Sequence, residues 1–373
     1  MLHEKIRICY EDYEAWMTTY FWEESKELYP GQVRPVILIC PGGAYRMTSD
    51  REAEAIAIRF MSMGYHTAVL RYSVAPAVYP TALCQLAKAV NILRKRSGEW
   101  LIDQDKILVM GFSAGGHLAA SLGTLWNNGE LAELLGLEAE DIRPNGLILS
   151  YPVITSGKEG HEESFRNLLG DRYEELRDQM SLENQVSRDT PETFIWHTME
   201  DTTVLPYNSI CFVQALAKYG IPAEYHLFPE GYHGIGLGNE LTANEDGRGI
   251  IRGCEEWSSL CEKWLNRRFP WWNPGYDFLR FSSREPGQKE SQIRKNDLRL
   301  SKKHWQGSGI LIIYFCQQLC SGHVDVNESD GIFVVIYQKN ENEKGLSNHK
   351  NCAMIVYSNR RIHESAGKQH KGM

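Results

Sequence analysis

One short segment, Gly111–Gly115 with the sequence Gly-Phe-Ser-Ala-Gly, constrains the fold more than any other part of the chain. It directly follows the apolar run Ile107–Met110 and directly precedes a helical pattern that begins at Gly116. Because glycine lets the backbone pass close to neighbouring strands, a serine flanked in this way can occupy a sharp turn between a strand and a helix. The turn exposes the Ser113 hydroxyl at a helix amino terminus, where backbone N–H groups favour negative charge. The segment therefore predicts a nucleophile elbow.

Apolar runs and helical patterns alternate along most of the chain. The apolar runs are short and continuous, as is typical of strands covered on both faces. The alternation predicts an α/β fold: a mainly parallel, doubly wound sheet with helices on both faces. Asp50 is expected to be the N-cap of one helix, which ends near Gly64. The other expected elements are the strands Val36–Cys40, His66–Leu70, Ile107–Phe112, Leu147–Ser150, Thr193–Trp196 and Ala223–Phe228, and the helices Thr81–Arg96, His117–Trp126, Leu205–Tyr219 and Glu255–Arg268.

Two regions depart from this alternation. Ala15–Trp22 has threonine and aromatic residues at strand-like spacing before a Pro30-Gly31 break, which predicts an antiparallel edge. Between residues 153 and 189 the pattern is lost to polar and charged residues. We interpret residues 153–189 as an insertion over the carboxyl ends of the strands, where a cap over a substrate site is often found.

The composition changes near Pro270. Residues 270–373 have 15 Lys and Arg residues against 10 Asp and Glu residues, although the whole chain carries a net charge of −8. Two strand-like runs in this part, Ile332–Tyr337 and Ala353–Tyr357, are too few to make a core. We predict one α/β domain over residues 1–269. We predict that residues 270–373 are a C-terminal extension, either weakly structured or a small accessory module.

Composition and charge exclude several classes of function. The chain is 42% hydrophobic and 24% charged, as soluble globular domains are, and its net charge of −8 argues against non-specific nucleic-acid binding. The apolar stretch Gly309–Cys316 is too short to span a bilayer. The segment Met1–Asp12 has no apolar core of a signal peptide, and the nine cysteines lack metal-ligand spacing. We therefore expect a cytoplasmic protein with reduced thiols, no metal and neither nucleic acid nor membrane as partner; the oligomeric state stays open.

A serine hydroxyl needs a base to remove its proton, and the base needs an acid to orient it. In α/β sheets that carry such an elbow, the order along the chain is serine, acid, histidine. Asp201 follows the strand Thr193–Trp196, and His233 lies between two glycines shortly after the strand that ends at Phe228. We predict that Ser113 is the nucleophile, His233 the base and Asp201 the acid.

Other acidic residues and histidines are weaker candidates. The alternatives to Asp201 are its neighbour Glu200 and, within the poorly patterned insertion, Asp178 and Asp189. His226 lies within a strand pattern and is expected to pack or to face solvent. We expect two further histidines to be structural residues beside the site, His117 and His197.

The loop Pro41–Tyr45, with the sequence Pro-Gly-Gly-Ala-Tyr, follows the strand Val36–Cys40. Ester hydrolysis places negative charge on the former carbonyl oxygen, and two preorganised N–H donors are the usual way to stabilise it. The loop and the Ala114 N–H beside the elbow are placed to supply such donors. The alternative interpretation of the loop is an ordinary turn.

Several stretches together resemble the α/β-hydrolase esterases that include bacterial acetyl-xylan esterases and short-chain carboxylesterases with a Pro-Gly-Gly-Gly-Tyr type of oxyanion loop. The resemblance covers about residues 1–269 and rests on segments that occur in the order typical of the family. These segments are Cys40–Tyr45, Arg51–Glu54, Arg71–Pro76, Gly111–Ala119 and the loops that contain Asp201 and His233.

The resemblance implies that residues 1–269 form a catalytic domain in which Ser113 is acylated, His233 acts as base and then as acid, and Asp201 orients it. It implies no metal or organic cofactor. The residues implied to offer oxyanion-hole N–H donors are Gly43, Ala44 and Ala114, and Tyr45 is implied to contact substrate.

One departure concerns the oxyanion loop, where Ala44 replaces the third glycine of the family and adds a methyl group near the substrate. The change bears on the size of the acyl group and not on the type of reaction. We expect a serine esterase that hydrolyses short-chain, acetyl esters of carbohydrates such as xylo-oligosaccharides. The alternatives are an arylformamidase-like hydrolase and a non-catalytic hydrolase-fold protein whose tail recruits a partner.

Overall fold

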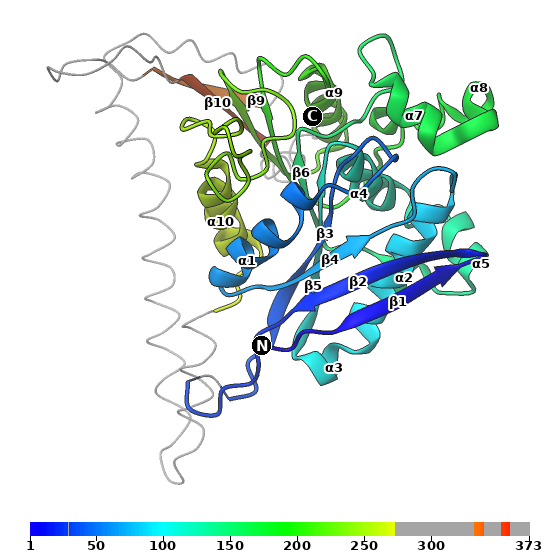
Figure 1. The fold of residues 1–373 in the computed structure, drawn as a ribbon, viewed down its shortest axis with the longest axis vertical. Coiled ribbons are helices and arrows are strands. Elements are labelled where there is room, and N and C mark those ends of the chain that lie inside the picture. Colours follow the sequence, from blue (N-terminus) through cyan, green and yellow to red (C-terminus); the bar gives the residue numbers. More distant parts are fainter. Residues whose placement is uncertain (29, 273–331, 339–351, 359–373) are drawn as a thin grey trace, which may run out of the picture. The chain divides into compact units, whose positions relative to one another are not determined.

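The computed structural model describes residues 1–28, 30–272, 332–338 and 352–358 of the 373-residue chain (Figure 1). The strands are β1 Lys5–Tyr10, β2 Tyr13–Tyr20, β3 Arg34–Cys40, β4 His66–Arg71, β5 Ile102–Phe112, β6 Gly146–Ser150, β7 Thr193–Thr198, β8 Ala223–Phe228, β9 Ile332–Gln338 and β10 Cys352–Ser358. The α-helices are α1 Glu54–Ser62, α2 Thr81–Lys95, α3 Ser97–Trp100, α4 Ala114–Leu125, α5 Glu130–Leu135, α6 Ala139–Ile142, α7 Glu162–Leu169, α8 Tyr173–Leu176, α9 Tyr207–Tyr219 and α10 Trp257–Arg268. Three short 3₁₀ turns are η1 Asp50–Glu52, η2 Gly170–Arg172 and η3 Leu182–Asn184.

The strands form one sheet in the order β1-β2-β4-β3-β5-β6-β7-β8-β10-β9. Strands β4, β3, β5, β6, β7 and β8 pair in parallel, so their carboxyl ends meet at one edge of the sheet. Strands β1 and β2 add an antiparallel edge beside β4. The predicted mainly parallel sheet is confirmed, and the loops at its carboxyl edge are where side chains from distant parts of the chain converge.

Side chains of the parallel strands alternate between two hydrophobic cores, one on each face of the sheet. In β3, Val36 and Leu38 pack in one core, whereas Ile37 and Ile39 pack in the other. Helices α2, α4 and α9 supply the first core, and helices α1 and α10 supply the second. Both cores are needed because the central strands are buried on both faces, as the burial of all seven residues of β3 illustrates.

One local expectation differs from the structure, and one strand was not expected. Strand β1 was not expected, although its alternating residues pair regularly with β2. Asp50 is not the N-cap of a helix: it begins η1, and Ala53 precedes α1. The turn tightens there because the Glu52 side chain points inward and accepts a hydrogen bond from the backbone of the neighbouring Gly42 loop. The segment 153–189, interpreted as an insertion, contains helices α7 and α8.

The two strand-like runs expected after Pro270 are strands, β9 and β10, and β10 pairs antiparallel with β8. The rest of the predicted extension, including Gly309–Cys316, lies outside the described residues. Residues 270–272 are described, and two hydrogen bonds join Pro270 and Trp271 to earlier parts of the chain. The Lys106 ammonium donates to the Pro270 carbonyl at 3.0 Å, and the Gln32 amide donates to the Trp271 carbonyl at 2.9 Å.

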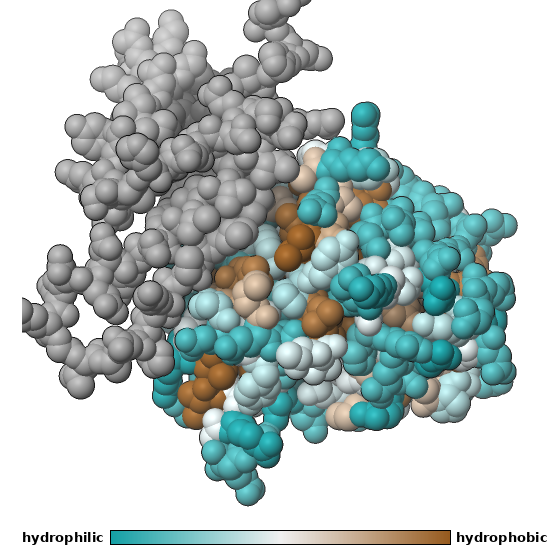
Figure 2. Space-filling model, turned by 90° about the horizontal axis from the view of Figure 1, so that it is seen from above, coloured by the Kyte–Doolittle hydropathy of each residue, from teal (hydrophilic) through white to brown (hydrophobic). Residues whose placement is uncertain are grey.

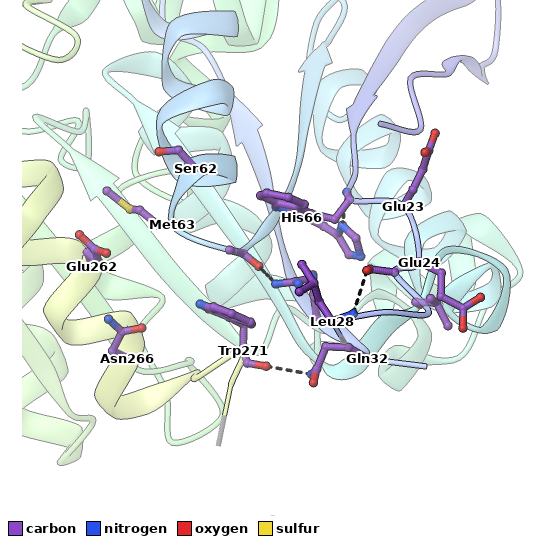
Figure 3. Close-up of a pocket in the computed structure, with 15 residues that line it drawn as sticks. Glu23, Glu24, Leu28, Gln32, Ser62, Met63, His66, Glu262, Asn266 and Trp271 are labelled. Atoms are coloured by element: carbon purple, nitrogen blue, oxygen red, sulfur yellow. Dashed lines mark hydrogen bonds between the residues drawn. The ribbon is translucent and has the colours of Figure 1, made fainter. Parts of the chain in front are cut away.

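A cavity of about 440 Å³ lies beside this attachment, at the amino ends of β3 and β4 (Figure 3). The Arg34 guanidinium is 4.4 Å from the ring of Trp271 and 5.3 Å from the ring of Trp22. This cation–π arrangement holds the chain that follows α10 against the segment that follows β2. The cavity lies at the opposite end of the strands from the loops that carry Ser113, so it is not the site of the predicted chemistry.

On the face shown in Figure 2, hydrophobic residues are separated by hydrophilic ones. The large exposed apolar side chains of the described residues are scattered over many elements, as is normal for a protein surface. None of the helices in this part of the chain is long and apolar enough to cross a membrane.

Candidate active site

Ser113 occupies a strained turn between β5 and α4. Its backbone has φ 53° and ψ −118°, and it serves as the N-cap residue of α4, which begins at Ala114 and not at the expected His117. A Cβ atom on Gly111 would overlap the backbone of Gly115, and one on Gly115 would overlap the backbone of β3. Both flanking glycines are therefore required by close backbone packing, as the predicted elbow demands.

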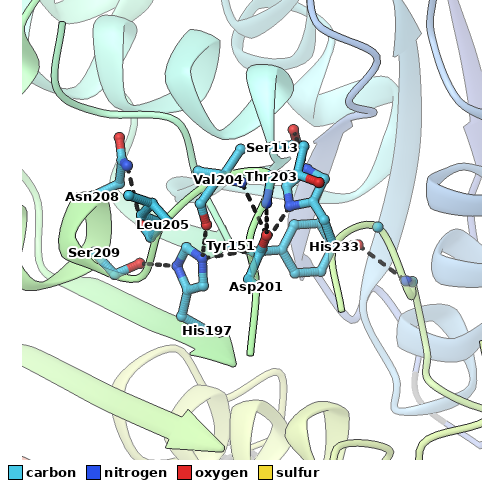
Figure 4. A network of polar contacts seen from close by, with 12 residues as sticks. Ser113, Tyr151, His197, Asp201, Thr203, Val204, Leu205, Asn208, Ser209 and His233 are labelled. Atoms are coloured by element: carbon cyan, nitrogen blue, oxygen red, sulfur yellow. Dashed lines mark hydrogen bonds and ion pairs between the residues drawn. The ribbon is translucent and has the colours of Figure 1, made fainter. Parts of the chain in front are cut away.

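The structure brings Ser113, His233 and Asp201 together (Figure 4). The Ser113 hydroxyl donates to His233 Nε2 at 2.7 Å, and His233 Nδ1–H donates to Asp201 Oδ2 at 2.7 Å. Three loops at the carboxyl edge of the sheet supply the three side chains, which lie after β5, β7 and β8. A carboxylate accepts and cannot donate, so this pairing places the imidazole proton on Nδ1 and leaves Nε2 free to accept a proton from the serine.

Asp201 is almost fully buried and held by several donors. Its Oδ1 accepts the N–H groups of Thr203 and Val204 at 3.0 and 2.9 Å, and His197 Nε2 lies 3.3 Å from Oδ2. Burial opposes ionisation, but the hydrogen bonds and charges of His197 and His233 outweigh it and place the pKa of Asp201 below its ordinary value. Asp201 is thus a fixed anion beside the imidazole. His197 is itself held by Ser209 and the Val204 carbonyl, a structural placement beside the site as expected.

The weaker candidates lie elsewhere. Glu200 accepts the Gly231 N–H at 3.1 Å and does not bond to His233. Asp178 is exposed on the surface and lies near Arg177, and Asp189 bonds with Asn127. His226 is buried and lies 2.9 Å from Glu224. The geometry therefore joins only one of the proposed acids to the imidazole.

Tyr45 and His117 form a buried pair beneath the elbow. The Tyr45 hydroxyl donates to His117 Nδ1 at 3.0 Å, and His117 Nε2–H donates to the Met180 carbonyl at 3.0 Å. Burial lowers the pKa of His117 to about 4, so the ring is neutral at physiological pH. This placement agrees with a structural role for His117. The predicted contact between Tyr45 and substrate stays a prediction, since the Tyr45 side chain is 2% exposed.

The loop Pro41–Tyr45 passes directly beside the serine. A Cβ atom on Gly42 would lie 2.9 Å from Ser113 Cβ, so only glycine fits at this closest approach. Ala44 has φ 55°, a region that L residues other than glycine rarely adopt. Among the described residues, the backbone N–H groups of Gly43, Ala44 and Ala114 donate to no acceptor. The loop is therefore more than a simple turn: it carries unused donors next to a hydroxyl.

Helix α7, within the segment 153–189, is fastened to this loop. Asn167 donates to the Ala44 carbonyl at 2.8 Å, and Glu163 forms an ion pair with Arg46 at 3.0 Å. The residue before the helix, His161, bonds with Ser164 at 2.9 Å. Burial, followed by the nearby charge of His233, lowers the pKa of His161. That this segment caps the site remains a prediction, but it does touch the loop beside Ser113.

Sequence reasoning missed two residues of the site, Glu52 and Tyr151. Glu52 lies in a run of charged residues that resembles an exposed helix start, yet it is 3% exposed and bonded to Gly42 and Tyr151. Tyr151 follows β6 with φ 37°, and its ring packs edge-on against His233 at a centroid distance of 5.0 Å. The only signal in the sequence was the position of Tyr151 at the carboxyl end of a central strand.

Among residues 1–28 and 30–272, no three His, Cys, Asp or Glu side chains are grouped to hold a metal ion. The chemistry available at the site is that of a hydroxyl, an imidazole, a carboxylate and backbone N–H groups. Such a set can move one proton from the serine to the histidine and stabilise negative charge on an oxygen.

The family model BD-FAE matches residues 27–216, which is half of the chain. This chain belongs to the BD-FAE family. The BD-FAE match spans β3 to α9 and so includes the elbow and Asp201, and the α/β-hydrolase fold expected from the sequence is confirmed by solved relatives. One of these is an acetyl ester-xyloside bifunctional hydrolase from Caldicellulosiruptor lactoaceticus, 34% identical with a TM-score of 0.59, aligned over 68% of this chain and 88% of that one.

Two further relatives are similar to this BD-FAE chain. Endo-1,4-beta-xylanase B of Butyrivibrio fibrisolvens is 38% identical over 217 residues, 56% of this chain and 33% of the xylanase. An acetylxylan esterase of Xylanibacter ruminicola is 29% identical over 205 residues, 53% of this chain and 40% of the esterase. The BD-FAE chain thus spans between a third and two fifths of the length of these two relatives.

Proposed function

We propose that this chain is a serine esterase that hydrolyses short-chain esters, acetyl esters of carbohydrates above all. One observation carries the proposal: an unbroken hydrogen-bonded series runs from Ser113 through His233 to Asp201, with both bonds at 2.7 Å. The series ends beside unused backbone N–H donors of the Gly43-Ala44 loop. A hydroxyl, a base and an oxyanion site at one point are what acyl transfer requires.

In the proposed reaction, Ser113 Oγ attacks the ester carbonyl carbon while its proton passes to His233 Nε2. The electron pair of the carbonyl bond moves to oxygen, where the free N–H groups of the loop and of Ala114 stabilise it. The carbon–oxygen bond to the alcohol then breaks, and the alcohol leaves with the proton from His233. Water attacks the acylated Ser113 by the same route in reverse, which releases the acid and restores the enzyme.

Asp201 stays ionised throughout this cycle because the pKa of its carboxyl lies below the ordinary value. Its charge favours the imidazolium that forms twice in each turnover, and its position keeps the proton on Nδ1 when the ring is neutral. No cofactor takes part in this mechanism.

The carbohydrate substrate rests on the relatives. Their names include an acetylxylan esterase, a xylanase and an acetyl ester-xyloside hydrolase. The Ala44 methyl group, beside the unused donors, favours a small acyl group such as acetyl. We also propose a cytoplasmic location, supported by the unpaired state of the six cysteines of residues 1–272, of which five are buried.

The test is an ester panel on the purified full chain, with acetylated xylo-oligosaccharides, p-nitrophenyl acetate and N-formylkynurenine as substrates. We expect both acetyl esters to be hydrolysed and the Ser113→Ala variant to lose at least about 10³-fold in kcat while melting at a similar temperature. Ser62→Ala, at the far end of α1, is the matched control and is expected to keep full activity.

Three outcomes would contradict the proposal. Ester hydrolysis by the Ser113→Ala variant would show that Ser113 is not the nucleophile. Preference for N-formylkynurenine would favour an arylformamidase-like hydrolase. Failure to hydrolyse any ester would favour a non-catalytic protein with this fold.

A further inference from the structure

A buried carboxylate outside the predicted triad connects the two loops on which the proposed chemistry depends. Glu52 is 3% exposed, and both of its oxygens accept hydrogen bonds. Oε2 accepts the N–H of Gly42 at 2.8 Å, and Oε1 accepts the hydroxyl of Tyr151 at 2.7 Å. Gly42 belongs to the loop beside Ser113, so one end of the carboxylate fixes that loop.

The other end reaches the loop that carries the histidine. The Tyr151 hydroxyl, which donates to Glu52, also accepts the N–H of Gly236 at 3.0 Å. Gly236 lies three residues after His233, and the Tyr151 ring packs against the imidazole. Tyr151 is itself fixed, because its ring is wedged against Trp196 at a centroid distance of 4.9 Å and its N–H bonds with the Trp196 carbonyl.

An ionised Glu52 fits this bonding pattern directly. Each carboxylate oxygen then accepts one hydrogen bond, Oε2 from the Gly42 N–H and Oε1 from the Tyr151 hydroxyl. Burial raises the pKa of Glu52, while the Tyr151 bond, the charge of His233 and the Gly42 bond oppose that rise. Glu52 and the His233 imidazole therefore lie close enough to interact electrostatically.

We propose, resting on the esterase function proposed above, that Glu52 is a positioning residue. It holds the oxyanion loop, through Gly42, and the histidine loop, through the Tyr151–Gly236 bridge, in fixed positions relative to each other. It also supplies a second negative charge that stabilises the imidazolium. Glu52 touches neither substrate nor the reacting atoms. The strained elbow at Ser113 lies between the loop that carries Gly42 and the loop that carries His233. It needs such a connection, because a misplacement of the reacting groups by about 1 Å can cost about 10²-fold in rate.

The charged and titratable groups around this network come from several elements. Those that face the imidazole are Asp201 after β7, Tyr151 after β6, Glu52 in η1 and His161 before α7, with His197 of β7 behind Asp201. Those that face Glu52 are Tyr151, His233, Arg51 and Tyr72. Glu52 and Asp201 are the two carboxylates among the groups that face the imidazole. Removing the charge of either carboxylate is therefore expected to disfavour the imidazolium form of His233.

The experiment compares the full-length wild type with Glu52→Gln, Tyr151→Phe and the control Glu54→Gln. Glu54 is two residues away on α1, exposed, and outside the network. The readouts are kcat, KM and the pH profile of kcat/KM on p-nitrophenyl acetate, with active sites counted by fluorophosphonate labelling. In Glu52→Gln the amide oxygen can still accept from the Gly42 N–H, but the amide NH2 faces the Tyr151 hydroxyl, so the proton of that hydroxyl loses its acceptor and the negative charge is removed.

We expect Glu52→Gln to lose about 10- to 100-fold in kcat per labelled site with KM changed by less than about threefold, as for a group that acts in the transition state. The acidic limb of the kcat/KM pH profile of Glu52→Gln is expected to move to lower pH, because the imidazolium of His233 is less favoured without the Glu52 anion. Tyr151→Phe, which keeps the carboxylate but breaks the bridge to Gly236, is expected to lose kcat. Glu54→Gln is expected to match the wild type.

A folded Glu52→Gln variant that keeps the wild-type kcat would overturn the proposal. The proposal would also be overturned if this variant lost activity while the acidic limb of its kcat/KM pH profile stayed in place, because a carboxylate with a merely structural role would give that result. If Glu52→Gln does not fold, wild-type kcat in Tyr151→Phe would overturn it. Failure of the proposed function is distinguishable from these results, because in that case the wild type itself would hydrolyse no ester.

Discussion

At the scale of single residues, two aspartates that were both candidates for the acid have different surroundings. Asp201 is bonded to His233, whereas Asp178 is exposed near Arg177. We expect Asp201→Asn to lose about 10³- to 10⁴-fold in kcat, because the amide no longer holds the imidazole proton on Nδ1. Asp178→Asn is the control and is expected to keep wild-type kinetics. Equal kinetics for the two variants on p-nitrophenyl acetate would contradict the assignment.

The dependence of activity on pH follows from the same residues. The pKa of Asp201 lies below its ordinary value and burial lowers the pKa of His117 to about 4, so neither group changes charge between about pH 5 and 8. Within that range an imidazole base cannot accept the Ser113 proton once it is protonated, and protonation of Glu52, whose pKa is raised by burial, acts in the same direction. We expect kcat/KM to fall as pH falls, and a flat profile over this range would argue against a histidine base.

These residues were predictable from the sequence because the carboxyl ends of parallel strands meet at one edge, so the order of Ser113, Asp201 and His233 along the chain indicated a meeting point. Glu52 was not predictable in the same way. Its neighbours Asp50 and Glu54 are acidic and exposed, and nothing local distinguishes the one carboxylate that turns inward. The bond between Glu52 and Gly42 exists only once α1 has packed on the sheet.

At the scale of elements, the elbow depends on close backbone contact between β5 and α4. A Cβ atom on Gly111 would meet backbone atoms of Gly115, which cannot rotate away. We expect Gly111→Ala to lower the free energy of unfolding by about 1–3 kcal/mol or more, as overpacking does. Gly98→Ala in α3, where the new Cβ meets open space, is the matched control and is expected to be neutral or slightly stabilising. Similar urea midpoints for the two variants would contradict the packing argument.

The elements themselves show which sequence signals were sufficient. The continuous apolar run of β3 predicted its burial on both faces, and the structure places alternate residues in two cores. Strand β1 was not predicted because two charged residues, Lys5 and Arg7, interrupt its apolar pattern, and its pairing comes from β2. Helix α7 lies in a charged segment, and its apolar face is stabilised by packing that includes Phe165 against His117 at a centroid distance of 5.1 Å.

At the scale of the whole molecule, the proposed site is contained in residues 1–272. Ser113, Asp201, His233 and the oxyanion loop all lie in this part, which ends at the bonds made by Pro270 and Trp271. We expect a chain cut after Trp272 to keep kcat/KM on p-nitrophenyl acetate within about twofold of the full chain. A cut before Pro270 is expected to lower the melting temperature, because Arg34 loses its Trp271 contact. Loss of activity in the longer fragment would show that residues 273–373 serve the site.

Covalent labelling tests the meeting of serine, histidine and carboxylate most directly. The full chain is treated with a fluorophosphonate at several pH values, and the adduct is located by mass spectrometry of peptides. The account predicts one adduct, on Ser113, formed more slowly as pH falls, strongly reduced in His233→Ala and absent in Ser113→Ala. An enzyme that hydrolyses acetyl esters yet carries no adduct on Ser113, or carries it on another residue, would contradict the account.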